Sequence, residues 1–132
     1  MGRKKIAVIT GASSGLGREF VQQLDKDARN KDPLFEEHPE ELWLIARRKE
    51  RLCELEKEAA TPVRVLAYDL TRKESILALQ ELLEKEQPNV RLLINAAGFG
   101  KIGATQDMPL DMLDGMIDLN CRAAVDMTQI CL

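Results

Sequence analysis

The sequence has few cysteines and a single histidine, and this shortage excludes two kinds of stabilised site. The three cysteines are an odd number with no Cys-x-x-Cys spacing, and His38 is the only imidazole available to join them. Neither a disulfide framework nor a Cys/His zinc site can be built from this set. We therefore predict reduced thiols and no bound metal.

Long apolar runs and an excess of basic charge are also missing. After a basic start, only the four apolar residues 6–9 precede Thr10 and Gly11, too few for a signal-peptide core or a membrane span. The 19 Lys and Arg residues against 22 Asp and Glu residues give a net charge of −3. This balance argues against nucleic acid or an anionic membrane surface as the main partner. The sequence thus predicts a cytoplasmic protein.

What the sequence does contain is a regular alternation of apolar runs and helix-spaced apolar stripes. With 132 residues, 45% hydrophobic and 31% charged, one globular domain is expected. The runs predict strands at 6–9, 42–45, 63–68 and 90–94. The stripes that follow them are Leu16, Phe20, Val21, Leu24 and Ala28; Leu52, Leu55 and Ala59; Ile76, Leu79, Leu82 and Leu83; and Leu113, Ile117, Ala124 and Met127. This alternation predicts a doubly wound α/β fold with a parallel sheet.

Two stretches interrupt the alternation. Residues 30–41 are longer than the usual connection of about 2–6 residues between a helix and a strand, and we expect a surface insertion there. Residues 99–109 follow the fourth predicted strand, at the carboxyl edge where open α/β sheets bind ligands. This second loop is placed to line a site.

The turn after the first strand carries the strongest signal for chemistry. It reads Thr10-Gly11-Ala12-Ser13-Ser14-Gly15-Leu16-Gly17, between a predicted strand and a predicted helix. Gly11 permits a sharp turn, Gly15 permits a diphosphate to approach backbone N–H groups, and Gly17 permits close packing of helix and strand. The helix N-terminus favours an anion, with the hydroxyls of Ser13 and Ser14 as further donors. The alternative is a tight turn without a ligand.

Two arginines follow the second predicted strand, at the position where an acid would select NAD(H). Dinucleotide-binding folds place an acid after the second strand to bind a ribose 2′-hydroxyl, but this chain has Ala46-Arg47-Arg48. Arg47 can bind a 2′-phosphate bidentately, which favours NADP(H) over NAD(H), whereas Arg48 is expected to face solvent. The alternative for Arg47 is a solvated side chain at a helix start.

Three further polar positions lie at predicted strand ends or on the last helix. Asp69 follows the third strand and can accept a hydrogen bond from an adenine amino group, because Thr71 and Glu74 form a capping box for the next helix. A helix-start acid is the alternative. Asn95 ends the fourth strand, and the small residues after it are Ala96, Ala97 and Gly98. Asn120 lies on the apolar stripe of the last helix, where an amide needs partners.

Together these motifs resemble the N-terminal half of a classical short-chain dehydrogenase/reductase. The resemblance covers nearly all of the chain and implies a Rossmann-type NAD(P)-binding domain over residues 1–132. It implies that Thr10 supports the turn and that the diphosphate is held by Gly11, Ser13, Ser14, Gly15, Leu16 and Gly17. It assigns the 2′-phosphate to Arg47, the adenine to Asp69 and Leu70, and the adenosine ribose to Asn95, Ala96, Ala97 and Gly98. Asn120 becomes the catalytic asparagine, positioning a water in a proton relay. Ala96 departs from the family, which often has a second asparagine there.

The rest of the family's catalytic set is not found in these residues. The expected Tyr-x-x-x-Lys segment is absent, and Tyr68, the only tyrosine, has Arg72 four residues on. The fold therefore looks truncated after the fourth β-α unit, with an exposed sheet edge. We expect a piece of a longer protein, or association through that edge as a homo-oligomer. The resemblance implies that the whole protein interconverts a small-molecule alcohol and a carbonyl compound, and that this chain is catalytically incomplete. The alternatives are a non-catalytic nucleotide-binding or assembly module, and a structural protein that has lost its ligand.

Overall fold

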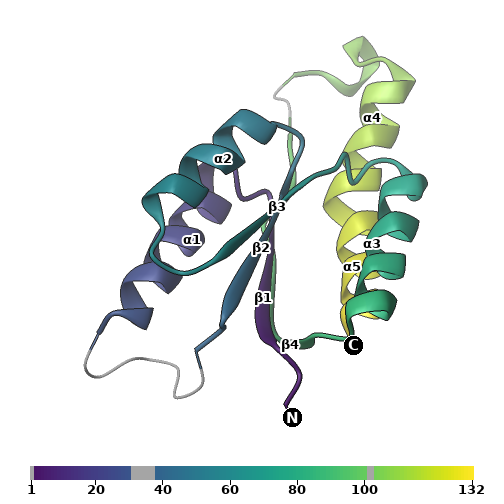
Figure 1. Cartoon of the computed structure of the whole chain (residues 1–132). Helices are drawn as coiled ribbons and strands as arrows, with labels where there is room; N and C mark the ends of the chain where they lie inside the picture. The colour runs from purple at the N-terminus through teal and green to yellow at the C-terminus, as the bar shows by residue number, and fades with distance from the viewer. Residues whose placement is uncertain (1, 31–37, 101–102) are drawn as a thin grey trace.

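The computed structural model describes residues 2–30, 38–100 and 103–132, and they form a four-stranded parallel sheet between two layers of helices (Figure 1). The strand order is β3-β2-β1-β4, and each neighbouring pair is parallel. The strands are β1 (Lys5–Thr10), β2 (Glu41–Ala46), β3 (Val63–Ala67) and β4 (Asn89–Asn95). The chain runs outward from β1 to β3 and then crosses back to β4 on the other side of β1, which places a topological switch point between β1 and β4 at the carboxyl edge of the sheet.

The two central strands are buried on both faces, as their continuous apolar sequence requires. Side chains alternate along β1, so Ile6 and Val8 join one hydrophobic cluster, whereas Ala7 and Ile9 join the other. The predicted doubly wound α/β fold is confirmed. The predicted strands lie within the observed ones, except that β3 ends at Ala67, one residue before Tyr68.

One helical layer covers each face of the sheet (Figure 1). The helices are α1 (Gly15–Ala28), α2 (Lys49–Glu58), α3 (Lys73–Glu86), α4 (Leu110–Ile117) and α5 (Ala123–Cys131), with a 3₁₀ turn η1 (Thr105–Asp107) before α4. Figure 1 shows α1 and α2 on one side, and α3 and α5 on the other. None of the helices within the described ranges has the length and apolar character that crossing a bilayer requires. Of the expected insertion, residues 31–37 lie outside the described residues.

The predicted apolar stripe of α1 is confirmed at Val21 and Leu24 and wrong at its other three positions. Leu16 is 68% exposed, and Phe20 and Ala28 are exposed as well. The face against the sheet carries Gly17 and Asp25 besides the two confirmed residues, so the helix is rotated relative to the predicted stripe. The reason is the glycine contact, because Gly17 packs directly on the backbone of the β1–α1 turn and thereby fixes the rotation of the helix.

The last helix is not continuous, as the stripe predicted, but is interrupted by a π-helical turn, η2 (Asp118–Arg122). A π turn holds more residues than an α turn and shifts the positions before it around the axis relative to those after it. Met127 in α5 is consequently buried, whereas Ile117 in α4 is 60% exposed. Asn120 is exposed and does not face the core.

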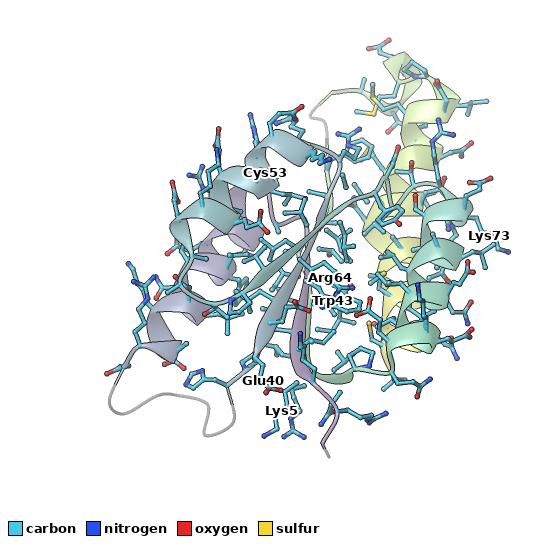
Figure 2. All side chains as sticks on the ribbon, viewed as in Figure 1. Lys5, Glu40, Trp43, Cys53, Arg64 and Lys73 are labelled. Carbon is cyan, nitrogen blue, oxygen red and sulfur yellow. The ribbon has the colours of Figure 1, made fainter. Side chains whose placement is uncertain are left out.

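Arg64 of the edge strand β3 contacts both the neighbouring strand β2 and the helix α3 (Figure 2). The Arg64 guanidinium lies 5.0 Å from the centroid of the Trp43 ring on β2 and also pairs with Glu86 of α3. The Trp43 indole N–H donates to Glu41 at 2.7 Å, which satisfies the one polar atom of this buried side chain. These contacts stabilise the sheet away from the pocket described next.

Candidate functional site

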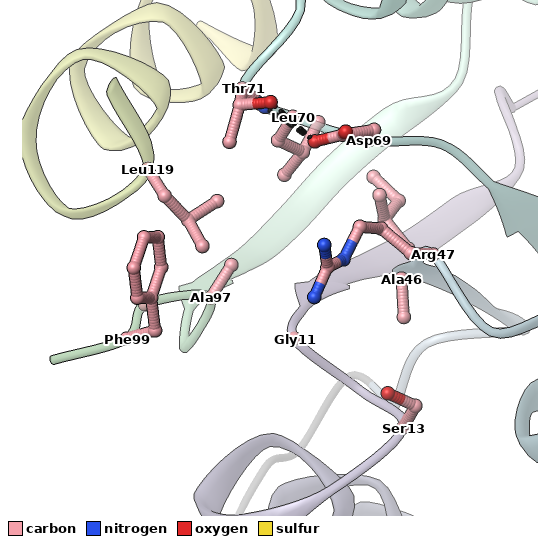
Figure 3. Close-up of a pocket in the computed structure, with 12 residues that line it drawn as sticks. Gly11, Ser13, Ala46, Arg47, Asp69, Leu70, Thr71, Ala97, Phe99 and Leu119 are labelled. Carbon is pink, nitrogen blue, oxygen red and sulfur yellow. Dashed lines mark hydrogen bonds between the residues drawn. The ribbon is translucent and has the colours of Figure 1, made fainter. Parts of the chain in front are cut away.

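A pocket opens at the carboxyl edge of the sheet, where the segments that follow all four strands meet (Figure 3). It is lined by Gly11, Ser13, Ile45, Ala46, Arg47, Asp69, Leu70, Thr71, Ala97, Gly98, Phe99 and Leu119. This is the location at which open α/β sheets bind ligands, outside the strand ends at a topological switch point.

The glycine turn packs backbone against backbone at two points. Gly11 has a φ of +63°, and a Cβ there would lie 2.6 Å from the Ala96 carbonyl oxygen. A Cβ on Gly17 would lie 2.2 Å from the Gly11 carbonyl oxygen. Neither site has room for a side chain, and both contacts hold the start of α1 against the strand ends.

Gly15 differs from these two glycines, because a Cβ built on it would meet no atom within 4 Å. Its φ of +55° still favours glycine. Ser14 caps α1, and its side chain makes no capping hydrogen bond. The first N–H groups of a helix have no partner within the helix. The start of α1 is therefore open to an anionic ligand.

Thr10 joins the β1 turn to the turn after β4. Its hydroxyl oxygen accepts hydrogen bonds from the N–H groups of Ala96 and Ala97, both at 3.1 Å, and its O–H lies 3.4 Å from the Ile94 carbonyl oxygen. The side chain is buried, so these bonds satisfy it. Thr10 thus fixes the floor of the pocket without lining it.

Arg47 supplies the positive charge of the pocket. Its side chain is exposed, and Figure 3 shows the guanidinium extending into the pocket on the side of Gly11 and Asp69. Arg48, the N-cap residue of α2, is exposed but does not line the pocket. The two adjacent arginines therefore have different surroundings.

The turn after β3 is built around Asp69, and the predicted capping box is wrong. The Asp69 Oδ1 atom accepts hydrogen bonds from the Thr71 N–H at 3.0 Å and from the Thr71 hydroxyl at 2.6 Å. The N-cap of α3 is Arg72, whose side chain makes no capping hydrogen bond, and the Thr71 hydroxyl donates to Asp69 instead of capping the helix. Burial raises the pKa of Asp69, but the bonds from Thr71 and the charges of Arg47 and Arg72 hold that pKa below its ordinary value.

The two predicted asparagines make different contacts. The Asn95 amide donates to the Thr128 hydroxyl of α5 at 3.3 Å, and Asn95 does not line the pocket. The Asn120 side chain accepts from the Phe99 N–H at 2.8 Å and donates to the Phe99 carbonyl at 2.7 Å. A Cβ on Gly98 would lie 2.7 Å from Asn120 Oδ1, so a larger residue there would displace the Asn120 side chain.

The pocket brings together about half of the residues that the sequence singled out. Those that line it are Gly11, Ser13, Arg47, Asp69, Leu70, Ala97 and Gly98. The others, which surround it or lie behind it, are Thr10, Ser14, Gly15, Leu16, Gly17, Asn95, Ala96 and Asn120. Phe99 belongs to the loop that was expected to line a site, of which residues 101–102 lie outside the described part. Thr71 and Leu119 were missed, although an acid two residues before a threonine is a signal for the Asp69 turn.

Comparison with known proteins identifies the family. The profile of short chain dehydrogenases matches residues 5–132. The chain belongs to the short-chain dehydrogenase family. The expected resemblance and the Rossmann-type fold are both confirmed. Members of this oxidoreductase family bind a nicotinamide dinucleotide, some as NADP(H) and some as NAD(H).

Individual relatives show how far the similarity extends. An uncharacterized oxidoreductase of Staphylococcus epidermidis is 26% identical over 96% of this chain and 50% of its own length. An NAD-dependent glycerol dehydrogenase of Listeria innocua is 30% identical over 96% of this chain and 45% of its own. The structure of a short-chain dehydrogenase from Sphingobium yanoikuyae in complex with NADPH is 28% identical, with a TM-score of 0.74, over 96% of this chain and 47% of that one. The chain thus spans about half the length of the curated relatives that it matches.

Proposed function

We propose that this chain is the coenzyme-binding part of an NADP(H)-preferring oxidoreductase that interconverts an alcohol and a carbonyl compound. The observation that carries the preference is Arg47, whose guanidinium extends into the pocket from the end of β2. No carboxylate occupies that strand end, where selection of NAD(H) uses an acid. A guanidinium matches a 2′-phosphate in both charge and geometry.

We assign the residues in and around the pocket to the adenosine and diphosphate portion of a dinucleotide. The open backbone at Gly15 and the start of α1 would hold the diphosphate, with Ser13 as a further donor. Asp69 and Leu70 would meet the adenine, and Ala97 and Gly98 would lie against the adenosine ribose. When bound, the coenzyme supplies or accepts a hydride.

The proton chemistry has no donor or acceptor of the expected kind among these residues. Tyr68 is half-buried and packs against the hydrophobic cluster shared with α3 and α5. Asn120 uses both ends of its side-chain amide on Phe99, which orders the loop that follows β4. For this chain we therefore propose coenzyme binding and orientation, and for the whole protein hydride transfer to a small-molecule substrate.

The test compares two adjacent arginines in the full-length protein. Arg47→Ala should weaken NADPH binding by about 10- to 100-fold, because hydrogen bonds to charged groups contribute roughly 1.5–3 kcal/mol. NADH binding should change little. Arg48→Ala is the matched control and should leave both affinities unchanged, since Arg48 does not line the pocket. Equal losses for both coenzymes in Arg47→Ala, or no loss, would show that Arg47 does not bind the 2′-phosphate.

Two further expectations stay proposals. β4 pairs with β1 on one side only among the described strands, which supports association of copies through this edge. Analytical ultracentrifugation of the 132-residue chain tests it, and a monomer at all concentrations would exclude it. The cytoplasmic location rests on three cysteines that are free thiols in this structure, and cell fractionation tests it.

A further inference from the structure

Arg122, in the π turn η2, does not line the pocket, but it contacts a residue that does. Its Nε lies 3.2 Å from Asp118 Oδ1, and its Nη1 lies 3.3 Å from Asp126 Oδ2. Asp118 lies four residues before Arg122, and Asp126 lies four residues after it. Its Nη2 donates to the Thr71 carbonyl oxygen at 2.7 Å. All three nitrogens of the guanidinium are thus engaged, and they point in fixed directions.

The Thr71 contact connects η2 to the wall of the pocket. Thr71 lines the pocket, and its N–H and hydroxyl both donate to the same carboxylate oxygen of Asp69. Three polar groups of Thr71 are therefore fixed, two by Asp69 and one by Arg122. Figure 3 shows the Asp69–Thr71 pair along one side of the pocket.

An ordinary surface ion pair does not account for this arrangement. Pairs four residues apart on a helix contribute only about 0.3–0.5 kcal/mol and need no third partner. Here the two aspartates lie on either side of Arg122 and orient its planar fork, so that the remaining nitrogen meets a carbonyl 51 positions away in the sequence. A lysine has a single ammonium and cannot reproduce the three directions.

We propose that Arg122 is a positioning residue for the adenine end of the coenzyme: it fixes the Thr71 carbonyl and, through Thr71, the orientation of the Asp69 carboxylate in the pocket. This inference rests on the proposed coenzyme site. Asp118 and Asp126 act one step further back, by holding the guanidinium. The bonds and the neighbouring positive charges that lower the pKa of Asp69 keep it ionised, and hence an acceptor, at neutral pH.

The experiment measures recognition of the adenine amino group, which a general loss of stability would not change selectively. The full-length protein is titrated with NADPH and with its hypoxanthine analogue, in which a carbonyl replaces the adenine amino group. Asp69 accepts a hydrogen bond from the amino group but repels the carbonyl, so the native protein should prefer NADPH by about 5- to 10-fold. Arg122→Met, which retains the length of the side chain, should reduce that preference to about 2-fold.

Companion variants make each result decisive. Asp69→Ala should abolish the preference, and adding Arg122→Met to it should cause no further loss of preference. Arg122→Lys should give an intermediate preference, and it replaces Arg122→Met if that variant does not fold. Arg51→Met is the control, because Arg51 is an exposed arginine of α2 outside the pocket. If a folded Arg122 variant kept the native preference for NADPH, or lost affinity equally for both ligands, the positioning role of Arg122 would be refuted but the proposed function would not. No binding of either ligand by the native protein would refute the proposed function as well.

Discussion

Replacing Gly17 with alanine tests the backbone contact that fixes α1 against the pocket. Gly17 lies in the first turn of α1 and has no unusual φ, so local helix propensity alone would make alanine more stable by up to about 1 kcal/mol. The structure predicts the opposite sign. The added Cβ would lie 2.2 Å from the Gly11 carbonyl oxygen and 2.6 Å from its carbonyl carbon, and these are backbone atoms that cannot rotate away.

The size of the effect follows from these two opposing contributions. Forcing extra atoms into a packed site costs about 1–3 kcal/mol, and the shift required here is large because both neighbours are backbone. We expect the free energy of unfolding to fall by about 2 kcal/mol. With a urea dependence of about 1–3 kcal/mol/M, the midpoint of urea unfolding of the full-length protein should fall by about 1 M. Coenzyme affinity should fall too, since the start of α1 would move.

Gly115→Ala is the matched control for this experiment. Gly115 is also a helical glycine, in α4, but a Cβ there would lie 3.5 Å from the Phe99 ring, an ordinary van der Waals contact. Alanine should therefore leave stability unchanged or raise it by up to about 1 kcal/mol. If Gly17→Ala were as stable as the native protein, or gained stability as Gly115→Ala is expected to, the glycine contact would not fix the rotation of α1.

Two further predictions concern polar contacts. Asn120→Ala removes both hydrogen bonds to the Phe99 main chain and should lower the free energy of unfolding by about 1–3 kcal/mol. Amide hydrogen exchange at Phe99 should become faster, and unchanged exchange there would contradict the contact. Asp25 is buried in α1, and burial raises its pKa. Hydrogen bonds from Thr61 and Arg29 lower the pKa by more than burial raises it, so the folded-state pKa lies below the ordinary 3.8. The stability that Asp25 contributes is therefore present above its unfolded pKa and is lost as pH falls through the folded pKa. In acid titrations of stability, Asp25→Asn should flatten this part of the curve, and an unaltered acid limb would show that the carboxylate contributes nothing.

The strands and the location of the pocket at their carboxyl ends were predictable because their signals are local. Buried parallel strands are continuous apolar runs, and the glycine turn, Arg47 and Asp69 follow such runs directly in the sequence. The rotation of α1 was missed although Gly17 was expected to pack closely, because the stripe was assigned from apolar periodicity, which does not register a glycine contact. The π turn was missed for a similar reason. The stripe through Ile117 and Met127 fits an uninterrupted α-helix equally well, and only the tertiary contacts decide between the two.

The π turn also has a thermodynamic consequence for the two ends of the pocket. Five consecutive residues hold the chain after β4 through Asn120 and the chain after β3 through Arg122. A ligand group that tightens one of these segments therefore changes the free energy of the other. By linkage, the change in affinity is the same in either direction. We therefore expect any cooperativity between occupancy at the adenosine portion and occupancy beside Phe99 to depend on the contacts of η2.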